Sequence, residues 1–122
     1  MNKIDQVIEM LRNGTKISRA IKEVYGNCKL YIPFNDKDFD IPIEELELST
    51  RSNNALMRCR FKTLNDVIQY IDENGWNKIK NFGRTSAAEV FGRIIDVAWD
   101  GMNTTQKAEF LISIDEENQG GI

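Results

Sequence analysis

Apolar residues recur at helical spacing along most of this chain, and this periodicity constrains the fold more than any other feature. The first stripe consists of Ile4, Val7, Ile8 and Leu11. Its i, i+3, i+4, i+7 spacing and the Gly14 that follows predict an amphipathic helix over residues 3–12. Similar spacing returns in several segments from residue 48 onward. The expected fold is therefore all-α: a compact domain of four to five short helices, plus an N-terminal helical hairpin.

The second helix of that hairpin is predicted directly after the first. Thr15 is its expected N-cap, residues 17–25 carry its apolar stripe, and Gly26 is its expected stop. Two helices of this size cannot bury both stripes by themselves. We expect the hairpin to pack on the rest of the chain or to form a dimer contact. Its basic polar face also has a slight helix-turn-helix character, but no recognition helix is predicted after Gly26.

The next segment has little helical periodicity. Residues 29–34 are β-prone and contain a proline, so an extended arm is expected there. Residues 35–47 are acidic and are predicted to form a connector over the surface. Ser49 or Thr50 is then the expected cap of a helix that reaches about Cys59.

Two sequence patterns of the capping-box type mark the starts of further helices. Thr63 with Asp66 predicts one, and Ser86 with Glu89 predicts the longest helix of the protein. A short helix around residues 75–79 is expected between them. The inward-facing residues predicted for the longest helix are Val90, Phe91, Ile94, Ile95, Ala98 and Trp99.

These elements suggest three parts. Residues 1–35 hold the hairpin and arm, residues 36–101 form the main helical domain, and residues 102–122 add one helix and a tail. The last helix is expected to start at a Thr104 cap. Its predicted inward residues are Ala108, Leu111 and Ile114. Residues 115–122 are expected to fray.

The composition excludes much chemistry. The chain has no histidine, so it lacks Ser-His and Cys-His nucleophile pairs and histidine-ligated zinc. Cys28 and Cys59 stand far apart, which rules out a C-x-x-C metal knuckle and favours free thiols. We therefore expect no catalytic residues, no metal, no cofactor and no small-molecule substrate. No apolar run reaches the roughly 20 residues of a membrane span, and no signal peptide is recognisable, so a cytoplasmic protein is predicted.

Charge is segregated along the sequence although the net charge is only −3. Residues 51–95 carry eight basic and four acidic side chains, whereas residues 34–50 and 96–122 each carry one lysine and six acids. A basic segment between acidic ones can hold a binding face that the overall charge conceals. The alternative is that these charges only solvate the helix surfaces.

The turn before the longest helix is the most informative local feature. Gly83 is expected to adopt a backbone conformation that a Cβ would penalise. The amides that open the next helix have no acceptor within it. Together with the helix dipole and Arg84 they would form a phosphate site, as in a helix-hairpin-helix. An ordinary tight turn between two helices is the alternative interpretation.

Four linked motifs extend this observation. They are PIEELEL at 42–48, RSNNAL at 51–56, TLNDVIQY at 63–70 and NFGRTSAAE at 81–89. In this order and spacing, they make residues 41–95 resemble the C-terminal domain of the bacterial RNA polymerase α subunit. The resemblance implies a compact all-α domain that binds the minor groove of A·T-rich DNA upstream of promoters and also contacts activators. It leaves RNA polymerase and other transcription factors open as partners.

The resemblance also implies which residues bind DNA. Arg51 would enter the minor groove, and Asn54, one helical turn further, would contact the sugar-phosphate edge. Asn81, Gly83 and Ser86 would meet the phosphate backbone, and Arg84 and Thr85 complete the expected site. The alternative for Arg51 is a surface ion pair with Glu47 or another nearby carboxylate.

Two features depart from the family pattern. Thr85 stands where the family usually has a lysine, which removes one cationic phosphate contact. Nothing in the sequence resembles the large assembly domain of an α subunit, so a small stand-alone protein is expected. The acidic flanks keep a second function open: a docking module that binds polymerase, a σ factor or an activator without holding DNA.

Overall fold

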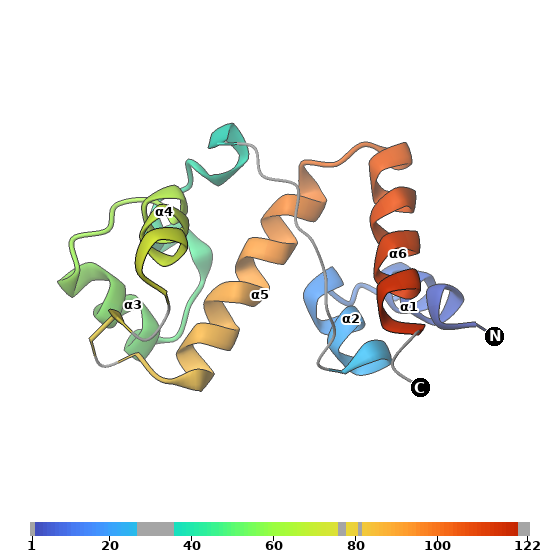
Figure 1. Cartoon of the computed structure of the whole chain (residues 1–122), viewed down its shortest axis with the longest axis horizontal. Helices are drawn as coiled ribbons and strands as arrows, with labels where there is room; N and C mark the ends of the chain where they lie inside the picture. Colours follow the sequence, from blue (N-terminus) through green and yellow to red (C-terminus); the bar gives the residue numbers. More distant parts are fainter. Residues whose placement is uncertain (1, 27–35, 76–77, 81, 120–122) are drawn as a thin grey trace. The chain divides into compact units, whose positions relative to one another are not determined.

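The structure is a computed structural model that describes residues 2–26, 36–75, 78–80 and 82–119. This part of the protein is α-helical, as predicted, and contains no strand (Figure 1). Its α-helices are α1 (Lys3–Arg12), α2 (Ile17–Tyr25), α3 (Thr50–Arg58), α4 (Leu64–Asn74), α5 (Arg84–Asp100) and α6 (Thr104–Gln119). Two 3₁₀ turns, η1 (Asp36–Phe39) and η2 (Ile43–Leu46), precede α3.

The protein divides into two compact units that share α5. The central unit contains η1, η2, α3, α4 and α5 up to Val97. The terminal unit contains α1, α2, α6 and the end of α5 from Ala98 onward. The three-part division expected from the sequence stays a prediction.

The terminal unit is held together by contacts from α6 and the end of α5. The Tyr25 hydroxyl at the end of α2 donates a 2.8 Å hydrogen bond to Asp115 Oδ1 on α6. Trp99 of α5 packs against Phe110 of α6, with their ring centroids 6.0 Å apart. The buried residues are Val7, Ile17, Ala20, Ile21, Ala98, Phe110, Leu111 and Ile114. The hairpin therefore covers its apolar stripe with the last helix of the protein.

The central unit forms its core from the acidic connector as well as from the helices. Phe39 of η1 is only 1% exposed, and Ile43 and Leu46 of η2 are also buried. Two main-chain bonds fix the connector to the start of α4: Ile43 N donates to Lys62 O at 3.0 Å, and Leu64 N donates to Ile41 O at 2.9 Å. The segment expected to wrap the surface is thus part of the core.

Several predicted helix ends are confirmed. Ser49 caps α3, because its Oγ accepts from Ser52 N at 3.3 Å. Thr63 and Asp66 form the complete reciprocal capping box of α4. Gly26 ends α2 with φ of 68°, and Cys59 is a free, half-buried thiol.

Three predicted caps are wrong. Lys16, not Thr15, is the N-cap of α2, and its side chain makes no capping bond. Asn103, not Thr104, caps α6, because its Oδ1 accepts from Gln106 N at 2.8 Å while Gln106 Oε1 accepts from Asn103 N at 2.9 Å.

The Ser86–Glu89 box is the third wrong cap. α5 begins at Arg84, and its first intrahelical bond runs from Ala87 N to Gly83 O at 3.0 Å. Ser86 therefore lies in the first turn rather than at the cap.

Two core assignments and one terminus also differ from the predictions. Phe91 on α5 is 39% exposed, and Ala108 on α6 is exposed. α6 continues to Gln119 and so includes residues 115–119 of the segment expected to fray. The predicted arm at 29–34, Cys28 and Trp76 lie outside the described residues.

Candidate nucleic-acid interface

The start of α3 presents two of the predicted DNA-binding side chains. Ser49 Oγ accepts a hydrogen bond from the backbone N of Ser52, so the first turn of α3 is capped. Arg51 follows as the second helical residue, and Asn54 lies one turn later on the same side of the helix. Both side chains are exposed, whereas Ser52 and Ala55 beside them are buried. The helix thus presents Arg51 and Asn54 together to solvent.

The start of α5 presents backbone donors. Gly83, Arg84 and Thr85 are exposed, and the amides of residues 83–86 precede Ala87 N, the first backbone donor of the helix. The positive end of the helix dipole adds to their affinity for an anion. Ser86 differs from these three exposed residues, because it is only 5% exposed, so its predicted contact with the phosphate backbone stays a prediction. Asn81 lies outside the described residues.

The expectation of a special backbone conformation at Gly83 is wrong. Positive φ occurs at Gly14, Gly26 and Gly75 but not at Gly83. A Cβ built on Gly83 would meet no heavy atom within 4 Å. The fold of this protein therefore does not require a glycine here. What the glycine provides is an unobstructed approach to the exposed amides at the start of α5.

Glu89 links the two helix starts. Its Oε2 accepts from the backbone N of Ser49 at 3.1 Å, and its Oε1 accepts from Ser49 Oγ at 3.0 Å. Glu89 is thereby bound to the N-cap of α3, two residues before Arg51. Sequence reasoning assigned this carboxylate to Ser86, because the S-x-x-E spacing fits a local capping box. No local signal identifies a partner forty residues earlier in the sequence.

The environment of Glu89 keeps its carboxylate charged. Burial acts to raise its pKa, but hydrogen bonds from the Ser52 side chain and from the backbone and hydroxyl of Ser49 act in the opposite direction, as does the charge of Arg93. The net result is a pKa below the ordinary value of 4.5. The link between α5 and α3 is therefore ionised at neutral pH.

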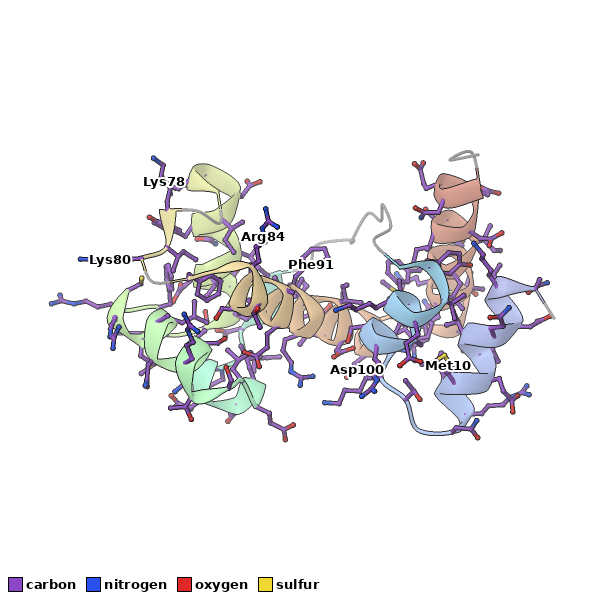
Figure 2. All side chains as sticks on the ribbon, turned by 90° about the horizontal axis from the view of Figure 1, so that it is seen from below. Met10, Lys78, Lys80, Arg84, Phe91 and Asp100 are labelled. Atoms are coloured by element: carbon purple, nitrogen blue, oxygen red, sulfur yellow. The ribbon has the colours of Figure 1, made fainter. Side chains whose placement is uncertain are left out.

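Basic side chains surround this surface. Arg51 forms no ion pair with any residue that the structure describes, so the alternative pairing with Glu47 is not observed. Figure 2 shows Lys78, Lys80 and Arg84 near the turn before α5, with their side chains directed outward. Arg93 differs, because it binds Asp96 at 3.1 Å and is largely buried.

The Cys, Asp and Glu residues in the described part of the protein form no group that could hold a metal ion. None of its helices is long and apolar enough to cross a membrane. The geometry is that of a polar surface with exposed cations and backbone donors.

Comparison with known proteins assigns the family. The family of the C-terminal domain of the bacterial RNA polymerase alpha chain matches residues 33–94, about half of this protein. The DNA-directed RNA polymerase subunit alpha of Synechococcus sp. (strain JA-2-3B'a(2-13)) is 35% identical over 104 residues, covering 69% of this chain and 30% of the relative. That of Mesostigma viride is 42% identical over 102 residues, covering 69% and 32%.

The same subunit of Phaeodactylum tricornutum is 46% identical over 55 residues, which cover 45% of this chain and 17% of the relative. The chain spans about a third or less of these relatives, and no solved structure is significantly similar to it. Since the family match includes α3, α4 and the first part of α5, the chain belongs to the family of the C-terminal domain of the bacterial RNA polymerase alpha subunit.

Proposed function

We propose that the central unit binds the minor groove and phosphate backbone of A·T-rich DNA and acts in transcription. The observation that carries this proposal is the Glu89–Ser49 link, which fixes the exposed Arg51 and Asn54 of α3 relative to the exposed amides of α5. A side chain that enters a groove and donors that hold a phosphate must keep a fixed spacing to act together. A single carboxylate provides that spacing.

Each part has a defined role in the proposal. Arg51 enters the minor groove, where narrow A·T-rich sequence deepens the negative potential. Asn54 contacts the sugar-phosphate edge, and the amides of residues 83–86 bind a phosphate. Arg84 adds a positive charge at this end, while Thr85 adds a hydroxyl without charge. Binding of this kind recognises groove shape and backbone rather than base edges.

The family supports the wider role. The relatives named above are subunits of DNA-directed RNA polymerase, and we propose that this protein likewise serves transcription through binding, without catalysis of its own. Its place is then the cytoplasm, beside polymerase and its DNA.

The test is a fluorescence anisotropy titration against A·T-rich and G·C-rich duplexes over a salt series. Wild type should prefer A·T-rich DNA, and its affinity should fall as salt rises. Arg51→Ala should remove the A·T preference. Arg12→Ala is the matched control, because Arg12 is an exposed arginine on α1 of the terminal unit, paired with Glu9 at 3.8 Å. Equal binding of both duplexes by wild type would contradict the proposal.

A second candidate function is protein docking. Glu44, Glu45 and Glu47 are exposed on and after η2, just before α3, and this acidic surface favours a basic partner such as a σ factor, an activator or polymerase itself. Arg51→Ala separates the two functions. Under the docking hypothesis it leaves partner capture intact, and wild type shows no DNA binding even at low salt.

A further inference from the structure

α3 carries a third exposed polar residue in line with Arg51 and Asn54. At about 100° per residue, positions 51, 54 and 58 lie within about 60° of one another around the helix axis. Arg51, Asn54 and Arg58 are all exposed, whereas Ser52 and Leu56, which lie toward the opposite side of the helix, and Ala55, which flanks the row, are buried. The outer face of α3 thus presents a row with a guanidinium at each end.

Arg58 is available to a ligand. It forms no ion pair with any residue in the described part of the protein. Met57 beside it is 48% exposed, so the central unit does not cover this end of α3. Arg93 shows the contrast, since Asp96 holds its guanidinium.

We propose that Arg58 is a second DNA-contacting cation of this protein and binds a phosphate at the edge of the groove that Arg51 enters. This inference rests on the proposed function. Seven residues of α-helix span about 10 Å, whereas the minor groove is about 6 Å wide. A helix that crosses the groove with Arg51 inside it therefore places Arg58 over the bordering phosphates.

The contact between Arg58 and a phosphate supplies a positive charge that the start of α5 lacks at Thr85. That side of the surface offers Arg84 and backbone amides, but Thr85 is neutral. With Arg58 engaged, the cationic contacts extend along α3 as well as around the turn before α5. Because Arg58 meets phosphate and not the groove floor, it contributes affinity and salt dependence without sequence preference.

The local alternative is that Arg58 only stabilises α3. It is a basic residue in the last turn, where a cation interacts favourably with the helix dipole. That role affects the free energy of unfolding but not the number of counterions released from DNA. The slope of log affinity against log salt concentration therefore separates the two roles.

The experiment measures that slope for wild type, Arg58→Ala, Arg58→Lys and the Arg12→Ala control on one A·T-rich duplex, with thermal melts of each variant. We expect Arg58→Ala to lower the magnitude of the slope by about 0.9 while the preference for A·T-rich over G·C-rich DNA persists. Arg58→Lys and Arg12→Ala should keep the wild-type slope. In the Arg58→Ala background, Thr85→Lys should restore it by adding a phosphate contact.

The experiment distinguishes failure of the Arg58 proposal from failure of the proposed function. An unchanged slope in Arg58→Ala, with the A·T preference still lost in Arg51→Ala, overturns the role of Arg58 and leaves the proposed function standing. Absence of wild-type binding to any duplex overturns both. A lowered melting temperature with an unchanged slope assigns Arg58 to helix stability alone.

Discussion

At the scale of single residues, Glu89 has a structural role that its exposed surroundings conceal. It is an acid on a surface proposed to meet phosphate, so its charge alone would oppose binding. Its two oxygens are instead bound by the backbone and the hydroxyl of Ser49. The residue therefore acts by positioning the start of α3, and the favourable contacts with DNA come from other groups.

The lowered pKa of Glu89 predicts how stability depends on pH. A carboxyl whose folded pKa lies below its unfolded value stabilises the fold above the unfolded pKa, and this contribution is lost as pH falls through the folded pKa. Wild type should therefore lose more stability than Glu89→Gln on acidification, with the difference arising below about 4.5, the ordinary value. Urea unfolding of both proteins between neutral pH and pH 3 measures this. If the unfolding free energies of the two proteins changed equally with pH, the Glu89 carboxylate would not stabilise the folded state.

At the scale of elements, short-range sequence patterns predict where the helices lie, but they predict only some of the residues that cap them. Thr63 and Asp66 satisfy each other within one turn, so the sequence contains the whole capping interaction. Ser86 and Glu89 have the same spacing, but Glu89 binds a serine on another helix. The connector differs from its prediction for a similar reason, since Phe39 and Ile43 become core residues only through contacts distant in sequence. The DNA-binding residues stay a prediction until the binding experiment is done.

The end of α3 shows a conformation that the sequence does not signal. Arg60 has φ of 64°, the left-handed region in which a glycine usually follows a helix. A residue with a Cβ is strained there by about 1–2 kcal/mol, partly offset by the smaller entropy loss of a non-glycine residue on folding.

Arg60→Gly should therefore raise the free energy of unfolding by about 1 kcal/mol, measured by denaturant unfolding. Arg60→Ala is the matched control, because it removes the same charge and keeps the Cβ, and it should give no such increase. An equal increase in both variants would assign the effect to charge and would contradict the conformational explanation.

At the scale of the whole molecule, the family match and the central unit nearly coincide, since the match begins at residue 33 and the central unit at residue 34. The match ends at residue 94, and the central unit ends at Val97. α5 then continues to Asp100 and contributes Trp99 to the terminal unit. One helix thus connects the family domain to a second core, and each core has its own stabilising contacts.

The terminal core has a cross-helix hydrogen bond that can be removed cleanly. Tyr25 donates to Asp115, while Lys3 Nζ lies 5.4 Å from the centre of the Tyr25 ring. Tyr25→Phe keeps the ring and removes the hydroxyl. Because the acceptor is a carboxylate and the bond is partly buried, the loss should cost about 1.5 kcal/mol of unfolding free energy, measured by urea unfolding followed by circular dichroism.

The same variant tests whether the terminal core affects DNA binding. If the central unit alone holds the DNA, Tyr25→Phe should leave the affinity and A·T preference at wild-type values under conditions where the variant is folded. Asp115→Asn is the control, since it weakens the same hydrogen bond from the side of α6. A fall in affinity shared by both variants would show that the terminal core contributes to the DNA-binding surface, and residues beyond α3 and α5 would then have to be included in it.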